Sequence, residues 1–150
     1  MSIKFAASYS ATVTANREDI WNIWSDPAKW PGLDDGNLAA ESKLAADGGK
    51  SGFREGAVIQ LHLRSGQTVD VQLTQVSEGK SFADETRIPY GIVRTEHKLE
   101  ESGKNLILSY SIDADVDEES VDAFTQEYWP NLLEGIPHQV HNVTALAKAA

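Results

Sequence analysis

The segment 116–150 has the pattern of one long amphipathic helix, and this feature constrains the fold most. Nearly everything before it alternates between apolar and polar residues, the period of a strand. A chain of strands that ends in one long helix is predicted to wrap a sheet around that helix. The apolar residues of the helix recur at spacings of three and four: Val121, Phe124, Tyr128, Leu132, Leu133, Ile136, Val140, Val143 and Ala147.

Two prolines are expected to interrupt this helix. Pro130 and Pro137 each lack a backbone N–H and crowd the preceding turn. The apolar stripes before and after Pro130 differ in direction by roughly 80°, at about 100° per residue, so we predict a bend between Trp129 and Pro130. Phe124 and Tyr128 would then face the entrance of a cavity, and the part after Pro137 would pack on the sheet.

The start of the helix is marked by acidic residues. Asp115 or Asp117 is the expected N-cap, and Glu118 and Glu119 would lie near the positive end of the helix dipole. Together with Asp113 these residues lack the spacing and the glycine of a calcium-binding loop. They are expected to form a solvated sheet edge and a helix start.

Strands joined by tight turns precede the helix. Six segments have clear strand patterns and one has a weak pattern. Glycine-containing turns between successive segments imply an antiparallel meander, because parallel strands need long crossovers. The predicted strands are 3–13, 57–64, 68–76, 81–88, 92–100 and 105–116, with the weak candidate at 38–45.

A short helix is predicted after the first strand. Asn16 is its expected N-cap, apolar residues from Ile20 to Trp24 form its buried face, and Asp26 and Pro27 end it. The predicted fold class is therefore α+β. A curved antiparallel seven-stranded sheet would wrap around a long kinked C-terminal helix, with one or two short helices after the first strand. Residues 1–150 have the length of a single domain.

Composition narrows the function classes. The net charge is −10 and lysine and arginine are nowhere clustered, which argues against nucleic acids and anionic membranes as partners. The chain has no cysteine, which excludes disulfides, thiolate nucleophiles and thiolate metal sites. It contains no dinucleotide fingerprint, phosphate loop or Ser-His-Asp order. The absence of a signal-like or membrane-spanning apolar run gives a cytoplasmic location as the expectation.

His97 is the first candidate for chemistry. Alternation places it on the inward face of its strand with Val93, Thr95 and Leu99. An imidazole in an apolar cavity can orient a carbonyl ligand or exchange a proton near neutral pH. The alternative is a core histidine that is hydrogen-bonded to a neighbouring element. No second catalytic partner is evident beside it in the sequence.

Aromatic and aliphatic residues complete the predicted ligand-binding set. Tyrosine hydroxyls can steer an enolate, and aromatic walls suit flat ligands, although such residues also fill cores. The strand 81–88 is ambiguous, since Phe82 and Ile88 share a face with Asp84 and Thr86. Besides Thr95 and His97, the predicted set comprises Tyr9, Trp24, Trp30, Leu61, Leu63, Val71, Leu73, Tyr90, Val93, Leu108, Tyr110, Phe124, Tyr128 and Leu132.

No metal or cofactor site is predicted. Glu134, His138 and His141 have helical spacing, but their projected angles lie opposite the apolar stripe and no further ligand is evident. These side chains are expected in solvent.

Four local motifs follow one another over nearly the whole chain: VTAN at 13–16 running into SDPAKWP at 25–31, FREGAVI at 53–59 leading to TQVSEGKSF at 74–82, EHKLE at 96–100, and the final helix. In this order they resemble the START/SRPBCC superfamily, and within it the polyketide cyclase/dehydrase-like group. Ser77 stands where proline is common in that family, and the two prolines of the last helix are also a departure.

The resemblance implies a helix-grip fold and leaves three functions open. The first is binding of a small hydrophobic molecule, aromatic, polyketide-like or lipid-like, in the cavity between the sheet and the C-terminal helix. The second is a cofactor-independent cyclase or dehydrase that uses His97 with a cavity tyrosine. The third is a protein-interaction module like the chaperone activators, using an outer sheet face or the loop 32–52. The chain is expected to be a monomer or a homodimer.

Overall fold

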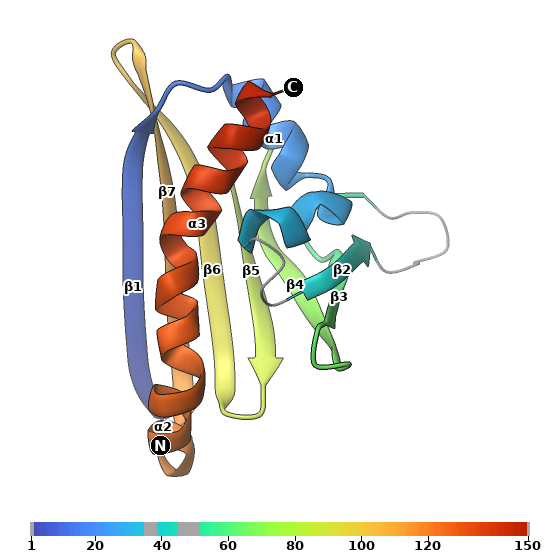
Figure 1. Ribbon diagram of the computed structural model, residues 1–150, viewed down its shortest axis with the longest axis vertical. Helices are drawn as coiled ribbons and strands as arrows, with labels where there is room; N and C mark the ends of the chain where they lie inside the picture. Colours follow the sequence, from blue (N-terminus) through green and yellow to red (C-terminus); the bar gives the residue numbers. More distant parts are fainter. Residues whose placement is uncertain (1, 35–38, 45–51, 150) are drawn as a thin grey trace.

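The computed structural model describes residues 2–34, 39–44 and 52–149. The fold consists mainly of an antiparallel sheet and a long C-terminal helix, which lies across one face of the sheet, as predicted (Figure 1). The strands are β1 (Ser2–Val13), β2 (Ala39–Leu44), β3 (Val58–Leu63), β4 (Thr68–Ser77), β5 (Ser81–Ile88), β6 (Gly91–Ser102) and β7 (Asn105–Asp117). The helices are α1 (Arg17–Trp24), η1 (Pro27–Asp34), η2 (Glu118–Ser120), α2 (Val121–Ala123), η3 (Phe124–Tyr128) and α3 (Trp129–Lys148).

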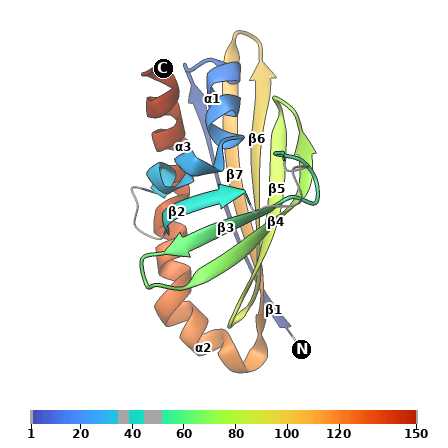
Figure 2. The same ribbon diagram turned by 90° about the vertical axis from the view of Figure 1, so that its right-hand side faces the viewer.

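The strands follow the order β1-β7-β6-β5-β4-β3-β2, and each neighbouring pair is antiparallel. From β3 to β7 the meander is continuous, because tight turns connect successive strands. β1 pairs with β7 at one edge, and β2, which lies inside the weak candidate 38–45, pairs with β3 at the other. Figure 2 shows β2, β3 and β4 turned steeply from the direction of β6 and β7, so the sheet curves around the helix.

The short helix α1 forms where the sequence predicts it. The side chain of Asn16 accepts a hydrogen bond of 2.8 Å from the backbone N–H of Glu18, which caps the helix N-terminus. The apolar side chains of α1 are buried against the core: Ile20, Trp21, Ile23 and Trp24.

The C-terminal helix is interrupted just before Pro130. A π-helical turn, η3, precedes α3, and Figure 2 shows α2 at an angle to the axis of α3. The backbone N–H of Trp129 bonds to the carbonyl oxygen of Phe124, five residues back, which widens the turn ahead of the proline ring. Pro137 lies inside α3, which continues through it, so the predicted interruption there is wrong. Ile136 and Val140 anchor this part of α3 in the core, which offsets the lost hydrogen bond.

The predicted N-cap position is confirmed for Asp117, one of the two candidates. Asp117 occupies the cap position of η2, but its side chain makes no capping hydrogen bond. Asp115 belongs to β7, and its carboxylate accepts a hydrogen bond of 2.8 Å from Arg94 on β6. The cross-strand cation competes for this carboxylate more effectively than the helix terminus does.

No helix of the described part is long and apolar enough to cross a bilayer.

Candidate functional site

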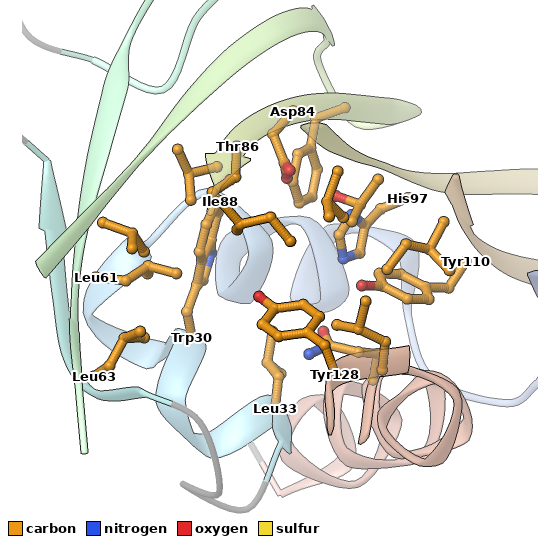
Figure 3. A pocket seen from close by; sticks show the side chains of 18 of the residues that line it. Trp30, Leu33, Leu61, Leu63, Asp84, Thr86, Ile88, His97, Tyr110 and Tyr128 are labelled. Carbon is orange, nitrogen blue, oxygen red and sulfur yellow. The ribbon is translucent and has the colours of Figure 1, made fainter. Parts of the chain in front are cut away.

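A cavity of about 190 Å³ lies between the inner face of the sheet and α3, beside η1. Figure 3 shows Asp84, His97 and Tyr110 around one side, Trp30, Leu61 and Leu63 around the other, and Tyr128 between the two sides. The remaining lining residues are Leu33, Gln67, Val69, Val71, Phe82, Thr86, Ile88, Pro89, Val93, Thr95, Ile112, Leu132 and Gln139.

Strand β5 supplies the residue that distinguishes this cavity from an apolar core. Phe82, Asp84, Thr86 and Ile88 alternate along it, and all four line the cavity. The ambiguity of this strand is thereby resolved: the mixed face is the inward one. Phe82, Asp84 and Ile88 are each at most 8% exposed, so the carboxyl group of Asp84 lies among buried apolar neighbours.

Burial changes the protonation of Asp84. The loss of solvent raises the pKa of this carboxyl group from 3.8 to about 7, although a hydrogen bond with the Thr95 side chain lowers it. Thr95 lies directly opposite Asp84 in the register of β5 and β6. Asp84 is therefore poised to exchange a proton near neutral pH.

His97 lies on the neighbouring strand, opposite Phe82. It is 6% exposed, and burial lowers its pKa to about 3, opposed by a hydrogen bond with the side chain of Gln139. The ring is therefore neutral at pH 7. Its Nδ1 atom is buried and has no hydrogen-bond partner within the described residues. A neutral imidazole can donate or accept a hydrogen bond, but it is not an acid at neutral pH.

Aromatic rings form much of the cavity wall. Trp30 is stacked on Phe82 with ring centroids 5.8 Å apart, and its Nε1 donates a hydrogen bond of 2.8 Å to the carbonyl oxygen of Trp24. This bond fixes the indole against the cavity. Tyr128 brings a second aromatic face, and burial is the main cause that raises the pKa of its hydroxyl. Its hydroxyl therefore stays protonated at neutral pH.

Ten of the residues that the sequence predicts for the site line the cavity. They come from η1, from the four strands β3, β4, β6 and β7, and from η3 and α3, so the fold gathers them from across the chain. They are Trp30, Leu61, Leu63, Val71, Val93, Thr95, His97, Tyr110, Tyr128 and Leu132.

The other six predicted residues lie outside the cavity lining. The hydroxyl of Tyr9 lies 3.0 Å from Nε2 of His141, next to the sheet edge formed by β1. Tyr90 donates a hydrogen bond of 3.0 Å to Glu127. Trp24, Leu73, Leu108 and Phe124 are at most 1% exposed and fill the solid part of the core. Alternation separates inward from outward residues, but it does not separate cavity wall from packed core.

Two further lining residues carry chemistry that the predicted set omits, Asp84 and Gln139. The signal for Asp84 is a carboxylate that alternates with Phe82 and Ile88. Gln139 follows Leu132 and Ile136 at helical spacing, so its polar side chain falls on the buried face of α3. A polar residue on an otherwise apolar face is the signal that identifies both.

The antiparallel sheet, the long helix across its face and the cavity between them have the arrangement of the helix-grip fold, as the resemblance predicted. Norcoclaurine synthase from Thalictrum flavum, as a point mutant with a transition state analogue, superposes with a TM-score of 0.71 at 15% identity, covering 99% of this chain and 97% of that one. The major latex-like protein 151 from Panax ginseng gives 0.72 at 11% identity, covering 95% and 96%.

A protein from Mesorhizobium loti gives a TM-score of 0.69 at 9% identity, covering 97% of this chain and 98% of that one. No protein-family model and no curated protein sequence matches the chain. At these identities the likeness shows the fold alone.

Proposed function

We propose that the chain binds a small, largely apolar molecule in the cavity between the sheet and α3. The observation that carries the proposal is the division of the cavity into an apolar side with Trp30, Leu61 and Leu63 and a side with the polar groups of Asp84 and His97. Ligand sites combine apolar walls with a few placed polar groups in this way.

The size of the cavity narrows the ligand. Drug-sized ligands occupy pockets of roughly 300–1,000 Å³, whereas an apolar cavity of about 150 Å³ holds one benzene ring. A cavity of about 190 Å³ therefore suits a molecule of about one ring with a short substituent. Norcoclaurine synthase, which has the same fold, has been solved in complex with dopamine and hydroxybenzaldehyde. A polycyclic polyketide or a long lipid chain would extend outside the cavity.

The tryptophans provide a direct test. The chain has four of them, Trp21, Trp24, Trp30 and Trp129, and only Trp30 lines this cavity. Protein labelled with 5-fluorotryptophan is titrated with single-ring compounds and followed by ¹⁹F NMR. The signal of Trp30, assigned by its loss in a Trp30→Phe variant, is expected to shift saturably, while the signal of Trp129 stays in place.

A cavity-filling substitution is the matched control. Leu63→Trp is expected to occupy the apolar side of the cavity and abolish the shift at Trp30, because ligand and side chain compete for the same space. Leu146→Trp adds the same side chain at an exposed position of α3 and is expected to leave binding intact. Absence of any saturable shift with every ring compound would contradict the proposed function.

A second candidate is cofactor-independent acid–base catalysis of the cyclase or dehydrase type. Asp84 favours it, because a cavity carboxyl group with a pKa of about 7 suits general base catalysis. His97, whose pKa is about 3, would serve as a hydrogen-bond partner for a carbonyl rather than as the base. Deuterium exchange into ring-bearing ketones, followed by NMR, tests this function. Protein-dependent exchange that is lost in Asp84→Asn supports it, and the absence of exchange contradicts it.

A further inference from the structure

The carboxyl group of Asp84 faces a cavity that offers it no cationic partner. Among the described residues that line the cavity, none is a lysine or an arginine. The other titratable groups facing the same space are His97 on β6, Tyr110 on β7 and Tyr128 ahead of α3; the lining residues of β3, β4 and η1 are uncharged. Thr95, directly opposite on β6, is a hydrogen-bond partner of Asp84.

We infer that the ligand of this cavity is a small amine, whose ammonium group pairs with the carboxylate of Asp84 while its apolar part lies between Trp30, Leu61 and Tyr128. This inference rests on the proposed function and names the chemical class of its ligand. It follows from charge complementarity: a buried carboxylate is stabilised by an opposite charge that brings its own hydrogen bonds, and the described residues of the cavity wall supply none.

The aromatic residues of the cavity wall also favour a cationic ligand, in addition to the carboxylate of Asp84. Tyr110 lies beside His97 on the polar side of the cavity, Tyr128 lies between the two sides, and Phe82 also lines the cavity (Figure 3). Aromatic ring faces attract cations where water is excluded. The net charge of −10 also favours the approach of cations over that of anions. An anionic ligand of the same shape would meet a carboxylate with no balancing charge.

The pH dependence of the affinity distinguishes an amine from a neutral ligand. Because burial raises the pKa of Asp84 to about 7, the empty site holds a carboxylic acid below that pH. An ammonium ligand needs the ionised carboxylate, so its affinity is expected to rise about tenfold per pH unit up to pH ~7 and then to level off. A neutral ligand that accepts a hydrogen bond from the protonated carboxyl group would bind more tightly at low pH.

The test compares matched probes of one shape and three charges. Benzylamine, benzyl alcohol and benzoate are titrated between pH 5 and pH 8, and the ¹⁹F signal of Trp30 reports binding. The set is repeated with the cyclohexylmethyl amine and alcohol to separate charge from aromaticity. At pH 8 the amines are expected to bind at least tenfold more tightly than the alcohols.

Variants of the site assign the effect to Asp84. Asp84→Asn keeps the shape and removes the charge, and is expected to weaken amine binding at least tenfold while alcohol binding is kept. Asp70→Asn, at an exposed position on β4, makes the same change in net charge and is expected to leave both unchanged. Thr95→Val removes a hydrogen bond that stabilises the carboxylate, so the pH midpoint of amine binding is expected to move upward.

The outcomes separate the inference from the proposed function. Binding of the alcohols with no preference for the amines, or amine binding that Asp84→Asn leaves unchanged, overturns the inference and leaves the cavity as a ligand site. Failure of every probe to bind at any pH overturns both. Tighter binding of the amines below pH 7 than above it also overturns the inference, because it shows that they do not need the ionised carboxylate of Asp84.

Discussion

The imidazole of His97 is stacked on the ring of Phe82, with ring centroids 4.1 Å apart and ring planes inclined by 10°. Trp24 and Tyr110 contact the imidazole edge-on. These rings exclude the water that a charged imidazolium would need. Asp84 lies two residues from Phe82 along β5, and water is excluded from its carboxyl group in the same way. One inward face therefore carries two titratable groups whose pKa values are displaced in opposite directions.

These displacements predict two opposing effects of pH on stability. The folded state binds the proton of Asp84 more tightly than the unfolded state does, so stability from Asp84 is lost as pH rises from 3.8 to about 7. The unfolded state binds the proton of His97 more tightly, so stability from His97 is lost as pH falls from 6.5 to about 3. Each displacement corresponds to at most about 4–5 kcal/mol. The two effects oppose each other between pH 4 and pH 6.5, and the wild-type profile there is expected to be shallow.

Single substitutions should expose each effect. In Asp84→Asn only the His97 effect remains, and the free energy of unfolding is expected to fall as pH is lowered from 6.5 to 4. In His97→Gln only the Asp84 effect remains, and the free energy is expected to fall as pH is raised over the same range. Urea unfolding at half-unit pH steps measures both. Parallel pH profiles for the two variants would contradict the opposed pKa values.

The sequence predicts the elements better than it predicts the cavity. Period-two alternation and turn glycines identify the strands because those patterns are local, and Asn16 identifies the start of α1 for the same reason. The local sequence pattern does not determine which inward side chains line the cavity and which pack in the core. Alternation places Val71 and Leu73 on the same inward face of β4, yet Val71 lines the cavity and Leu73 is packed in the solid core.

The polar residues of the site show the same limit. Thr95 and His97 follow from the alternation of β6. Asp84 lies on a face of β5 that carries both apolar and polar residues. Only the pairing of β5 with β4 and β6 decides whether this face points inward. The pKa of Asp84 then depends on neighbours from several elements, so its chemistry emerges only with the tertiary structure.

Gln139 is predicted to hold His97 in place. It is a hydrogen-bond partner of the ring, whose Nδ1 is already unpaired, so Gln139→Leu would leave both ring nitrogens without a side-chain partner. The expected cost is about 1–3 kcal/mol in the free energy of unfolding. Gln139→Glu places a carboxylate beside the ring and is expected to raise the pKa of His97, measured by NMR titration of its ring. An unchanged pKa in this variant would show that Gln139 does not contact the imidazole.

Gly91 is predicted to be intolerant of any side chain. Its φ of 152° lies in a region that favours glycine, and an added Cβ would lie 2.0 Å from the backbone oxygen of Asp115. Gly91→Ala must therefore displace β6 from β7, with an expected loss of about 2 kcal/mol or more. Gly66→Ala is the control, since Gly66 has a φ of 94° but open space around it, and about 1 kcal/mol is expected. Equal losses in thermal or urea unfolding would contradict the close approach at Gly91.

Pro137 is predicted to limit the stability of α3. It lies inside a helix that continues through it, where its ring crowds the carbonyl group of Leu133 and one backbone hydrogen bond is lost. Proline costs about 3 kcal/mol relative to alanine in a helix interior. Because Pro137 is half-buried and its ring also packs, Pro137→Ala is expected to raise the free energy of unfolding by about 1–2 kcal/mol.

Pro130→Ala is the matched comparison for this helix. The π-helical turn η3 already widens the backbone ahead of Pro130, so removing its ring relieves less crowding and a smaller gain is expected. Urea unfolding of both variants, with hydrogen exchange of the amides of α3, measures the difference. An equal or larger gain from Pro130→Ala would show that the strain of the C-terminal helix is centred on η3. The wall that Tyr128 and Leu132 give the cavity would then rest on the more strained segment.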